Sequence, residues 1–203
     1  MTELGFVHQF IPGSSERTLL MLHGTGGDEE QLIPLARELD PGAAILSPRG
    51  KISENGSARF FRRLAEGVFD LEDLRVQTDA LAEFVRQAVH HYGLDLGKIV
   101  TVGYSNGANI AASILLRHPD VLRTAMLLRA MVPFQPEELP DLGGVEIWIA
   151  GGNQDPLIPR LNTERLAEML SEAGAEVTAH FFEAGHALTN TELVLAKRWL
   201  DAL

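Results

Sequence analysis

A serine with a glycine two residues away on each side follows a short apolar segment near the middle of the chain. The motif is Gly-Tyr-Ser-Asn-Gly at 103–107, with Ser105 at its centre, and segment 98–102 before it reads Lys-Ile-Val-Thr-Val. Segment 108–112, Ala-Asn-Ile-Ala-Ala, favours a helix. A sharp turn from strand to helix strains the serine backbone, and the glycines remove Cβ atoms that would collide there. The pattern predicts a nucleophile elbow with Ser105 as the nucleophile.

A serine hydroxyl is a poor nucleophile until a base takes its proton, and that base is usually a histidine oriented by a carboxylate. With an elbow of this kind, the chain order is serine, then acid, then histidine. Two histidines lie well downstream, His180 and His186. His180 falls inside the expected strand 177–182, which would carry it away from the serine. His186 falls in a loop between an expected strand and a helix, and we predict it as the base.

Three carboxylates between the serine and this histidine are candidates for the orienting acid. Asp155 follows the apolar segment 145–150 through a Gly-Gly-Asn-Gln turn, which places it at the carboxyl end of an expected strand. Asp120 follows a His-Pro pair at a helix end, where a turn or cap role suits it. Asp141 lies in a proline-rich segment and could be simple surface charge. We predict Asp155.

The tetrahedral intermediate of acyl transfer needs two N–H donors aimed at its oxygen. We expect one from the backbone of Asn106, directly after the nucleophile, and the other from Thr25. Thr25 lies in the glycine-rich loop 23–28, which follows the apolar segment 18–22. The loop could also be a plain turn or a phosphate cradle, but no Gly-Lys-Ser/Thr follows it. His23 is expected to be structural rather than a second base.

The composition limits the kinds of protein and partner that fit this chain. The chain has 203 residues, which favours a single domain over 1–203, and its 45% apolar and 22% charged content is ordinary for a globular protein. A net charge of −11 argues against nucleic acid and anionic membrane surfaces as partners. The absence of cysteine excludes disulfides and cysteine nucleophiles, and no histidine spacing suits a metal. No apolar segment approaches the roughly 20 residues of a membrane span, and no secretory signal is visible, so we expect a cytoplasmic protein.

Short β-branched apolar segments alternate with longer amphipathic ones along the chain. This alternation predicts βαβ units and an α/β fold with a mostly parallel sheet. The expected strands are 6–10, 18–22, 43–47, 99–104, 124–128, 145–150 and 177–182. The expected helices are 29–39, 71–92, 106–117, 161–173 and 187–203. Segments 48–58 and 131–144 fit neither pattern; both follow expected strands, where open α/β sheets bind ligands, although both could be surface connections.

These motifs together resemble the α/β-hydrolase superfamily, and within it the phospholipase/carboxylesterase family, which includes bacterial carboxylesterases and acyl-protein thioesterases. The matching segments are 22–28, 103–109, 152–159 and Gly185-His186. The resemblance implies a central sheet of about seven strands with helices on both faces and no cap domain. It also implies ester hydrolysis without a cofactor and, in many members, a homodimer. Dienelactone hydrolase fits less well, because its usual nucleophile is cysteine.

Segment 59–70 resembles the bacterial carboxylesterase branch, in whose members this region approaches the pocket. On that basis Phe60, Phe61 and Arg62 are expected to contact the substrate. Met131 and Leu157 are expected as further substrate contacts. Either Arg62 or Arg63 could pair with a substrate carboxylate. The alternative is that the two phenylalanines are core residues and the arginines are solvated.

The expected activity is hydrolysis of small or medium carboxylic esters by a serine carboxylesterase, with short acyl chains preferred because no insertion is long enough for a cap domain. A lysophospholipase or acyl-thioesterase with the same triad is the main alternative. A hydrolase-fold binding protein without catalysis is a third, disfavoured by the intact Ser105, Asp155 and His186.

Overall fold

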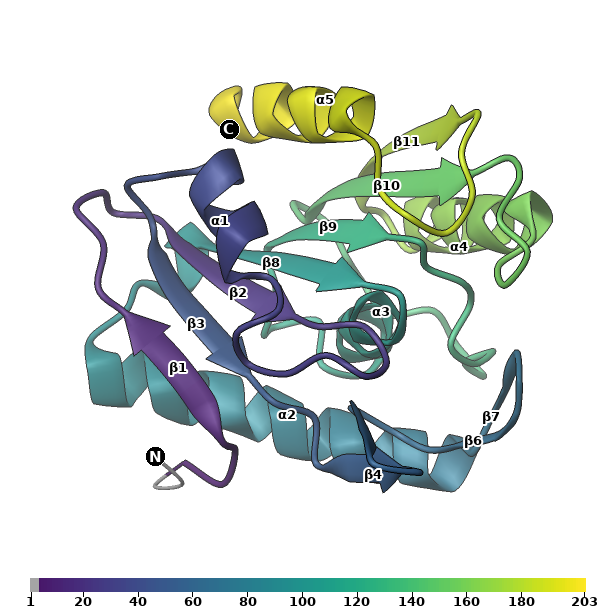
Figure 1. Cartoon of the computed structure of the whole chain (residues 1–203), viewed down its shortest axis with the longest axis horizontal. Helices are drawn as coiled ribbons and strands as arrows, with labels where there is room; N and C mark the ends of the chain where they lie inside the picture. Colours follow the sequence, from purple (N-terminus) through teal and green to yellow (C-terminus); the bar gives the residue numbers. More distant parts are fainter. Residues whose placement is uncertain (1–3) are drawn as a thin grey trace.

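A seven-stranded sheet forms the centre of the computed structural model, which describes residues 4–203 (Figure 1). The strand order is β1-β3-β2-β8-β9-β10-β11, and only the edge strand β1 runs antiparallel, against β3. The strands are β1 (His8–Ile11), β2 (Thr18–Leu22), β3 (Ala44–Pro48), β8 (Ile99–Tyr104), β9 (Thr124–Leu128), β10 (Glu146–Gly152) and β11 (Glu176–Phe182). The mostly parallel sheet of seven strands expected from the sequence is confirmed.

Helices cover both faces of this sheet, as the resemblance implied. They are α1 (Ile33–Leu39), α2 (Leu71–Tyr92), α3 (Asn106–Arg117), α4 (Arg160–Glu172) and α5 (Asn190–Asp201). Helices α1 and α5 lie on one face, and α2, α3 and α4 lie on the other (Figure 1). Each face carries its own buried apolar cluster, because consecutive strand residues point to opposite sides of the sheet. Within residues 4–203, none of the helices combines the length and the apolar character that a membrane crossing needs.

Boundaries differ by at most three residues from the sequence expectation, apart from two local features that differ more. Helix α1 begins at Ile33 rather than residue 29, and Pro34 lies in its first turn, where its missing N–H is tolerated. The segment between β3 and α2 forms two small hairpins, β4 (Ile52–Glu54) with β5 (Ser57–Arg59) and β6 (Arg63–Ala65) with β7 (Val68–Phe69). The first hairpin turns at Asn55-Gly56, and both residues have a positive φ, as a two-residue hairpin turn requires.

The parallel strands bring distant loops to one edge of the sheet. Strands β2, β8, β10 and β11 all end at this edge, and the loops that follow them carry Thr25, Ser105, Asp155 and His186. In open α/β sheets this edge is where ligands bind. The fold therefore gathers the sequence-predicted residues in one place.

Candidate active site

Ser105 lies in a strained turn between β8 and α3. Its φ of 54° is in the left-handed region, which is unusual for a residue with a side chain, and its N–H donates to the carbonyl of Leu128 at 2.8 Å. A Cβ on Gly103 would come within 2.6 Å of the Cα of Ala108, so only glycine fits at the start of the turn. This is the local geometry of a nucleophile elbow, with the serine at the amino end of α3.

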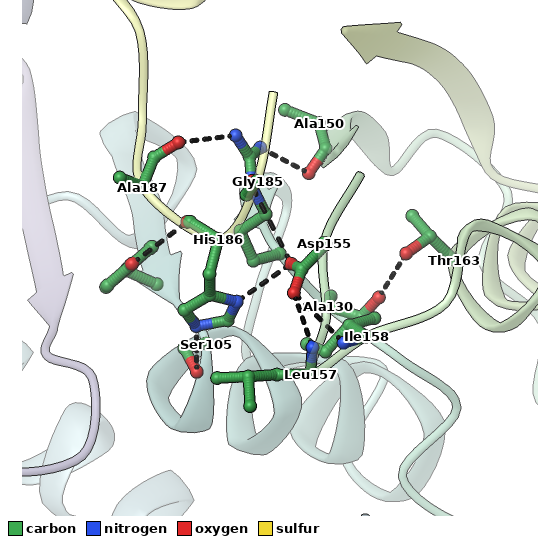
Figure 2. Close-up of polar contacts among 12 residues, drawn as sticks. Ser105, Ala130, Ala150, Asp155, Leu157, Ile158, Thr163, Gly185, His186 and Ala187 are labelled. Atoms are coloured by element: carbon green, nitrogen blue, oxygen red, sulfur yellow. Dashed lines mark hydrogen bonds and ion pairs between the residues drawn. The ribbon is translucent and has the colours of Figure 1, made fainter. Parts of the chain in front are cut away.

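A line of hydrogen bonds joins the three expected catalytic side chains (Figure 2). Nε2 of His186 lies 3.0 Å from Oγ of Ser105, and Nδ1 of His186 lies 2.8 Å from Oδ2 of Asp155. Because an ionised carboxylate only accepts, Nδ1 carries the proton and Nε2 is free to accept from the serine. This arrangement can move the serine proton to an imidazole that a carboxylate stabilises.

The environment of Asp155 fixes its orientation. Its side chain is fully buried, and Oδ1 accepts the N–H groups of Leu157 and Ile158 at 2.8 and 3.1 Å (Figure 2). The second oxygen is thereby directed to the histidine. The other candidate acids lie elsewhere: Asp120 pairs with Arg86 at 2.8 Å, and Asp141 accepts the N–H of a nearby glycine.

The histidine that the sequence argument set aside lies outside the site. His180 lies within β11, and its ring centroid is 5.7 Å from that of Trp148. It is absent from the lining of the cavity beside the serine. His180 is thus held within β11, whereas His186 lies in the loop after this strand and reaches Ser105.

The two expected oxyanion donors, Thr25 and Asn106, both border the cavity at Ser105. Asn106 is the first residue of α3, so its N–H has no partner within the helix. Its side-chain oxygen accepts the N–H of Phe60 at 2.7 Å, and the Thr25 hydroxyl accepts a hydrogen bond from Arg59 at 2.8 Å. Residues 59 and 60 therefore hold both expected donor residues, Thr25 and Asn106, through the side chains of those two residues.

His23 joins the loop after β2 to the loop after β3. The ring is completely buried; Nδ1 donates to the carbonyl of Gly24 at 2.7 Å, and Nε2 accepts the N–H of Gly50 at 2.9 Å. Burial lowers the pKa of His23, which keeps the ring neutral and able to accept. These contacts match the structural role expected for this residue.

A cavity of about 420 Å³ opens beside Ser105. Three groups of side chains border it: the polar residues Thr25, Asn106, Asn109, Tyr104 and His186; the apolar residues Phe69, Met131, Leu157 and Ile158; and the charged residues Arg59, Arg63 and Glu66. The expected contacts Met131 and Leu157 are thus at the cavity. Among residues 4–203, no group of three or more histidine, aspartate or glutamate side chains is arranged to hold a metal ion.

Phe60 and Phe61 do not border this cavity, contrary to the expectation. They are 1% and 0% exposed and belong to the apolar core. Phe60 packs against the ring of His23 with centroids 4.6 Å apart, and Phe61 packs edge-on against Phe69 at 4.9 Å. The structure shows the core role that the sequence left as an alternative. Two large apolar rings gain more free energy from full burial than from lining a partly solvated cavity.

Arg62 also lies away from the cavity. Its guanidinium is 3.4 and 3.5 Å from the carboxylates of Asp70 and Asp73, at the start of α2. The cavity is bordered instead by its neighbours Arg59 and Arg63. The sequence argument missed Arg59, because nothing in the chain distinguishes one arginine of 59–63 from another before the hairpins are folded.

The model of the dienelactone hydrolase family matches residues 49–195. The chain belongs to the dienelactone hydrolase family. The sequence argument ranked dienelactone hydrolase as a poorer fit because its usual nucleophile is cysteine; the match nevertheless places the chain in the family named after that enzyme. This member has Ser105 at the elbow.

Relatives and solved structures agree with a hydrolase. MhqD of Bacillus subtilis (strain 168), a protein named as a hydrolase, is 44% identical over 192 residues, which is 95% of this chain and 96% of the relative. The Bacillus cereus carboxylesterase structure is 45% identical with a TM-score of 0.96 and covers 99% of this chain and 96% of that one. A carboxylesterase from Mesorhizobium loti is 33% identical with a TM-score of 0.94, covering 100% and 98%. The expected α/β-hydrolase membership with carboxylesterase relatives is confirmed, and this dienelactone hydrolase family member is a hydrolase.

Proposed function

We propose that this hydrolase is a serine carboxylesterase that cleaves small or medium carboxylic esters through an acyl-enzyme. One observation carries the proposal: the unbroken line from Asp155 through His186 to Ser105, with distances of 2.8 and 3.0 Å, ends at a cavity. The carboxylesterases among the similar solved structures support ester hydrolysis as the reaction.

In the proposed reaction, Oγ of Ser105 attacks the acyl carbon while Nε2 of His186 takes the hydroxyl proton. Asp155 stabilises the resulting imidazolium through Nδ1–H. The backbone N–H groups of Thr25 and Asn106 bind the oxygen of the tetrahedral intermediate. Collapse of this intermediate breaks the ester C–O bond, and His186 returns its proton to the leaving alcohol. Water then attacks the acyl-enzyme and gives a proton to His186. Breakdown of the second intermediate frees the acid, and His186 returns that proton to Oγ of Ser105.

The size of the cavity favours small substrates. Its volume of about 420 Å³ is near the lower end of the roughly 300–1,000 Å³ of small-molecule sites. Met131 and Leu157 offer apolar contact to a short acyl chain or alcohol. We therefore propose short acyl esters rather than long-chain lipids as substrates.

The first experiment is hydrolysis of p-nitrophenyl esters with acyl chains of about two to twelve carbons, with Ser105→Ala beside the wild-type protein. Activity that is greatest at short chains and absent in the variant supports the proposal. A rise in kcat/KM towards twelve carbons would instead favour the lysophospholipase alternative.

Two further assays distinguish the remaining alternatives. A preference for acyl thioesters over oxygen esters of the same chain length would indicate an acyl-thioesterase. Covalent labelling by a fluorophosphonate reports a reactive serine even when the tested esters are poor substrates. A protein that neither reacts with this probe nor turns over any ester would be a binding protein.

A further inference from the structure

Three successive backbone carbonyls around His186 are held by side chains. Nε of Arg129 donates to the carbonyl of Gly185 at 2.9 Å, and Nη2 of Arg129 donates to that of Ala187 at 2.9 Å. Between them, the hydroxyl of Tyr104 donates to the carbonyl of His186 itself at 3.0 Å. Residues 185–187 form the histidine loop. Figure 2 shows the carbonyl of Ala187 accepting from a guanidinium nitrogen close to the proposed triad.

The two donors come from the strands that also position the nucleophile. Tyr104 is the last residue of β8 and directly precedes Ser105. Arg129 directly follows β9, whose last residue, Leu128, accepts the N–H of Ser105. Arg129 has a φ of 59°, a backbone conformation that is unfavourable for a residue with a side chain and that persists only where the surrounding structure requires it. One piece of backbone thus sets the place of both the nucleophile and the histidine loop.

The charge of Arg129 is balanced by a residue outside the proposed triad. The Arg129 side chain is 0% exposed, and its Nη2 lies 2.7 Å from Oε1 of Glu192, which is buried in the first turn of α5. Nε of Arg129 is 3.9 Å from Oδ2 of Asp155, beyond hydrogen-bond distance, while that oxygen is 2.8 Å from Nδ1 of His186. Glu192 therefore takes the close contact with the guanidinium and leaves Asp155 to the imidazole.

We propose that Arg129 is a positioning residue for His186, with Tyr104 as a second donor and Glu192 as the counter-ion that holds the guanidinium at hydrogen-bond distance, so that Asp155 forms only a longer ion pair with Arg129. The inference rests on the proposed triad, because Arg129 contacts the histidine loop and does not border the cavity beside Ser105. Its physical basis is that the imidazole reaches Ser105 across a single hydrogen bond of 3.0 Å. A displacement of about 1 Å at such a contact can reduce the rate about 100-fold.

Arg129→Lys tests the positioning role. Lysine keeps the positive charge for Glu192, but it lacks the planar fork that reaches two carbonyls at once. We expect kcat to fall about 100-fold with KM changed by less than about twofold, because substrate contacts remain. Tyr104→Phe removes one of the three donated bonds and should lower kcat by a smaller factor.

Arg37→Lys is the matched control. Nη1 of Arg37 donates to the carbonyls of Pro41 and Ala43 at 3.1 and 2.9 Å, so it holds a loop in the same way. That loop precedes β3 and lies at the edge of the sheet opposite to Ser105. The control should keep wild-type kcat, and urea unfolding of both lysine variants shows whether they lose similar stability.

Glu192→Gln tests the counter-ion role, since glutamine keeps an acceptor for Arg129 and removes the negative charge. The charged and titratable groups around the imidazole are then Arg129, Asp155 and Tyr104. Burial raises the pKa of Tyr104, which therefore stays a neutral donor. Without the charge of Glu192, the guanidinium is drawn towards Oδ2 of Asp155, now 3.9 Å from its Nε, and competes with the hydrogen bond from Nδ1 of His186. The Nδ1–H resonance of His186 should therefore move in Glu192→Gln.

This resonance is measured by NMR on the resting protein, with the His186 ring assigned from the spectrum of His186→Gln. Because the NMR measurement needs no substrate, it tests the positioning role separately from the proposed reaction. A wild-type protein without Ser105-dependent turnover would contradict the esterase proposal but not the positioning role. Two outcomes would overturn the inference. One is an Arg129→Lys protein whose kcat equals that of Arg37→Lys. If neither variant turns over ester, the equivalent outcome is an Nδ1–H resonance of His186 that is unchanged in Arg129→Lys. The other is an Nδ1–H resonance of His186 that does not move in Glu192→Gln.

Discussion

Gly107 packs its Cα directly against the backbone carbonyl of Leu22, and a Cβ at this position would overlap that oxygen. The contact joins the first turn of α3 to the end of β2, from which the loop carrying Thr25 departs. The second glycine of the elbow therefore has two roles. It permits the sharp turn, and it lets α3 approach β2 closely enough to set the distance between the nucleophile and the proposed oxyanion donor.

This contact predicts a large cost for Gly107→Ala. We expect a loss of about 3 kcal/mol or more in the free energy of unfolding, because the added methyl meets backbone atoms that cannot rotate away. Gly97→Ala is the control, since its Cβ would meet only the flexible carboxylate of Asp95, at 3.3 Å. Urea unfolding of the two variants measures the difference. Equal stability of both would show that β2 and α3 can separate without cost.

Asp155→Asn should impair turnover far more than stability. The amide can donate to Nδ1 of His186 and so favour the tautomer whose Nε2 cannot accept from Ser105. We expect kcat to fall by about four orders of magnitude, while fluorophosphonate labelling slows in parallel. Ester hydrolysis at a near-normal rate in this variant would assign the orienting role to another acid.

Thr25→Val tests how the proposed oxyanion loop is held. Valine has the shape of threonine but cannot accept the hydrogen bond from Arg59, whose side chain is 4% exposed. A hydrogen bond to a charged group contributes about 1.5–3 kcal/mol. We expect loop displacement to lower kcat about tenfold, equivalent to about 1.4 kcal/mol in the barrier. Thr25→Ser keeps the hydroxyl and should retain most activity; if valine and serine variants turn over ester equally fast, Arg59 does not position this loop.

Acid should destabilise the folded protein through His23. Burial holds the pKa of His23 in the folded state below its ordinary value of 6.5, so the unfolded chain binds the proton first as the pH falls. The stability contributed by the neutral ring is present above pH 6.5 and is lost as the pH drops from 6.5 towards the lowered pKa. A single proton accounts for at most about 1.4 kcal/mol per pH unit.

The measurement is urea unfolding between about pH 5 and 8, for the wild-type protein and His23→Asn. The asparagine variant should be less stable at pH 8 but should show a shallower decline with acid, because its amide does not titrate. Parallel curves would place the acid sensitivity in other groups. The next residues to test are Glu29 and Arg49, whose side chains form a close ion pair.

The sequence by itself determined the sheet, the elbow and the order of Ser105, Asp155 and His186. These features are local: a strand needs a short apolar segment, and the elbow needs glycines at fixed offsets from the serine. Parallel strands then bring their carboxyl ends to one edge, so a motif after each strand predicts proximity without coordinates. The Asn55-Gly56 turn was an equally local signal for the first small hairpin, although the predicted elements did not include it.

The tertiary structure alone decided which residues support that site. Arg129 is a single arginine after a strand, and its partners, Gly185, Ala187 and Glu192, lie more than fifty positions further along the chain. Phe60 and Phe61 were expected at the substrate site and are core residues, because hairpin packing directs their rings inward and leaves Arg59 at the cavity. Contacts of this kind depend on where a side chain points after the elements have packed, and no local pattern encodes that direction.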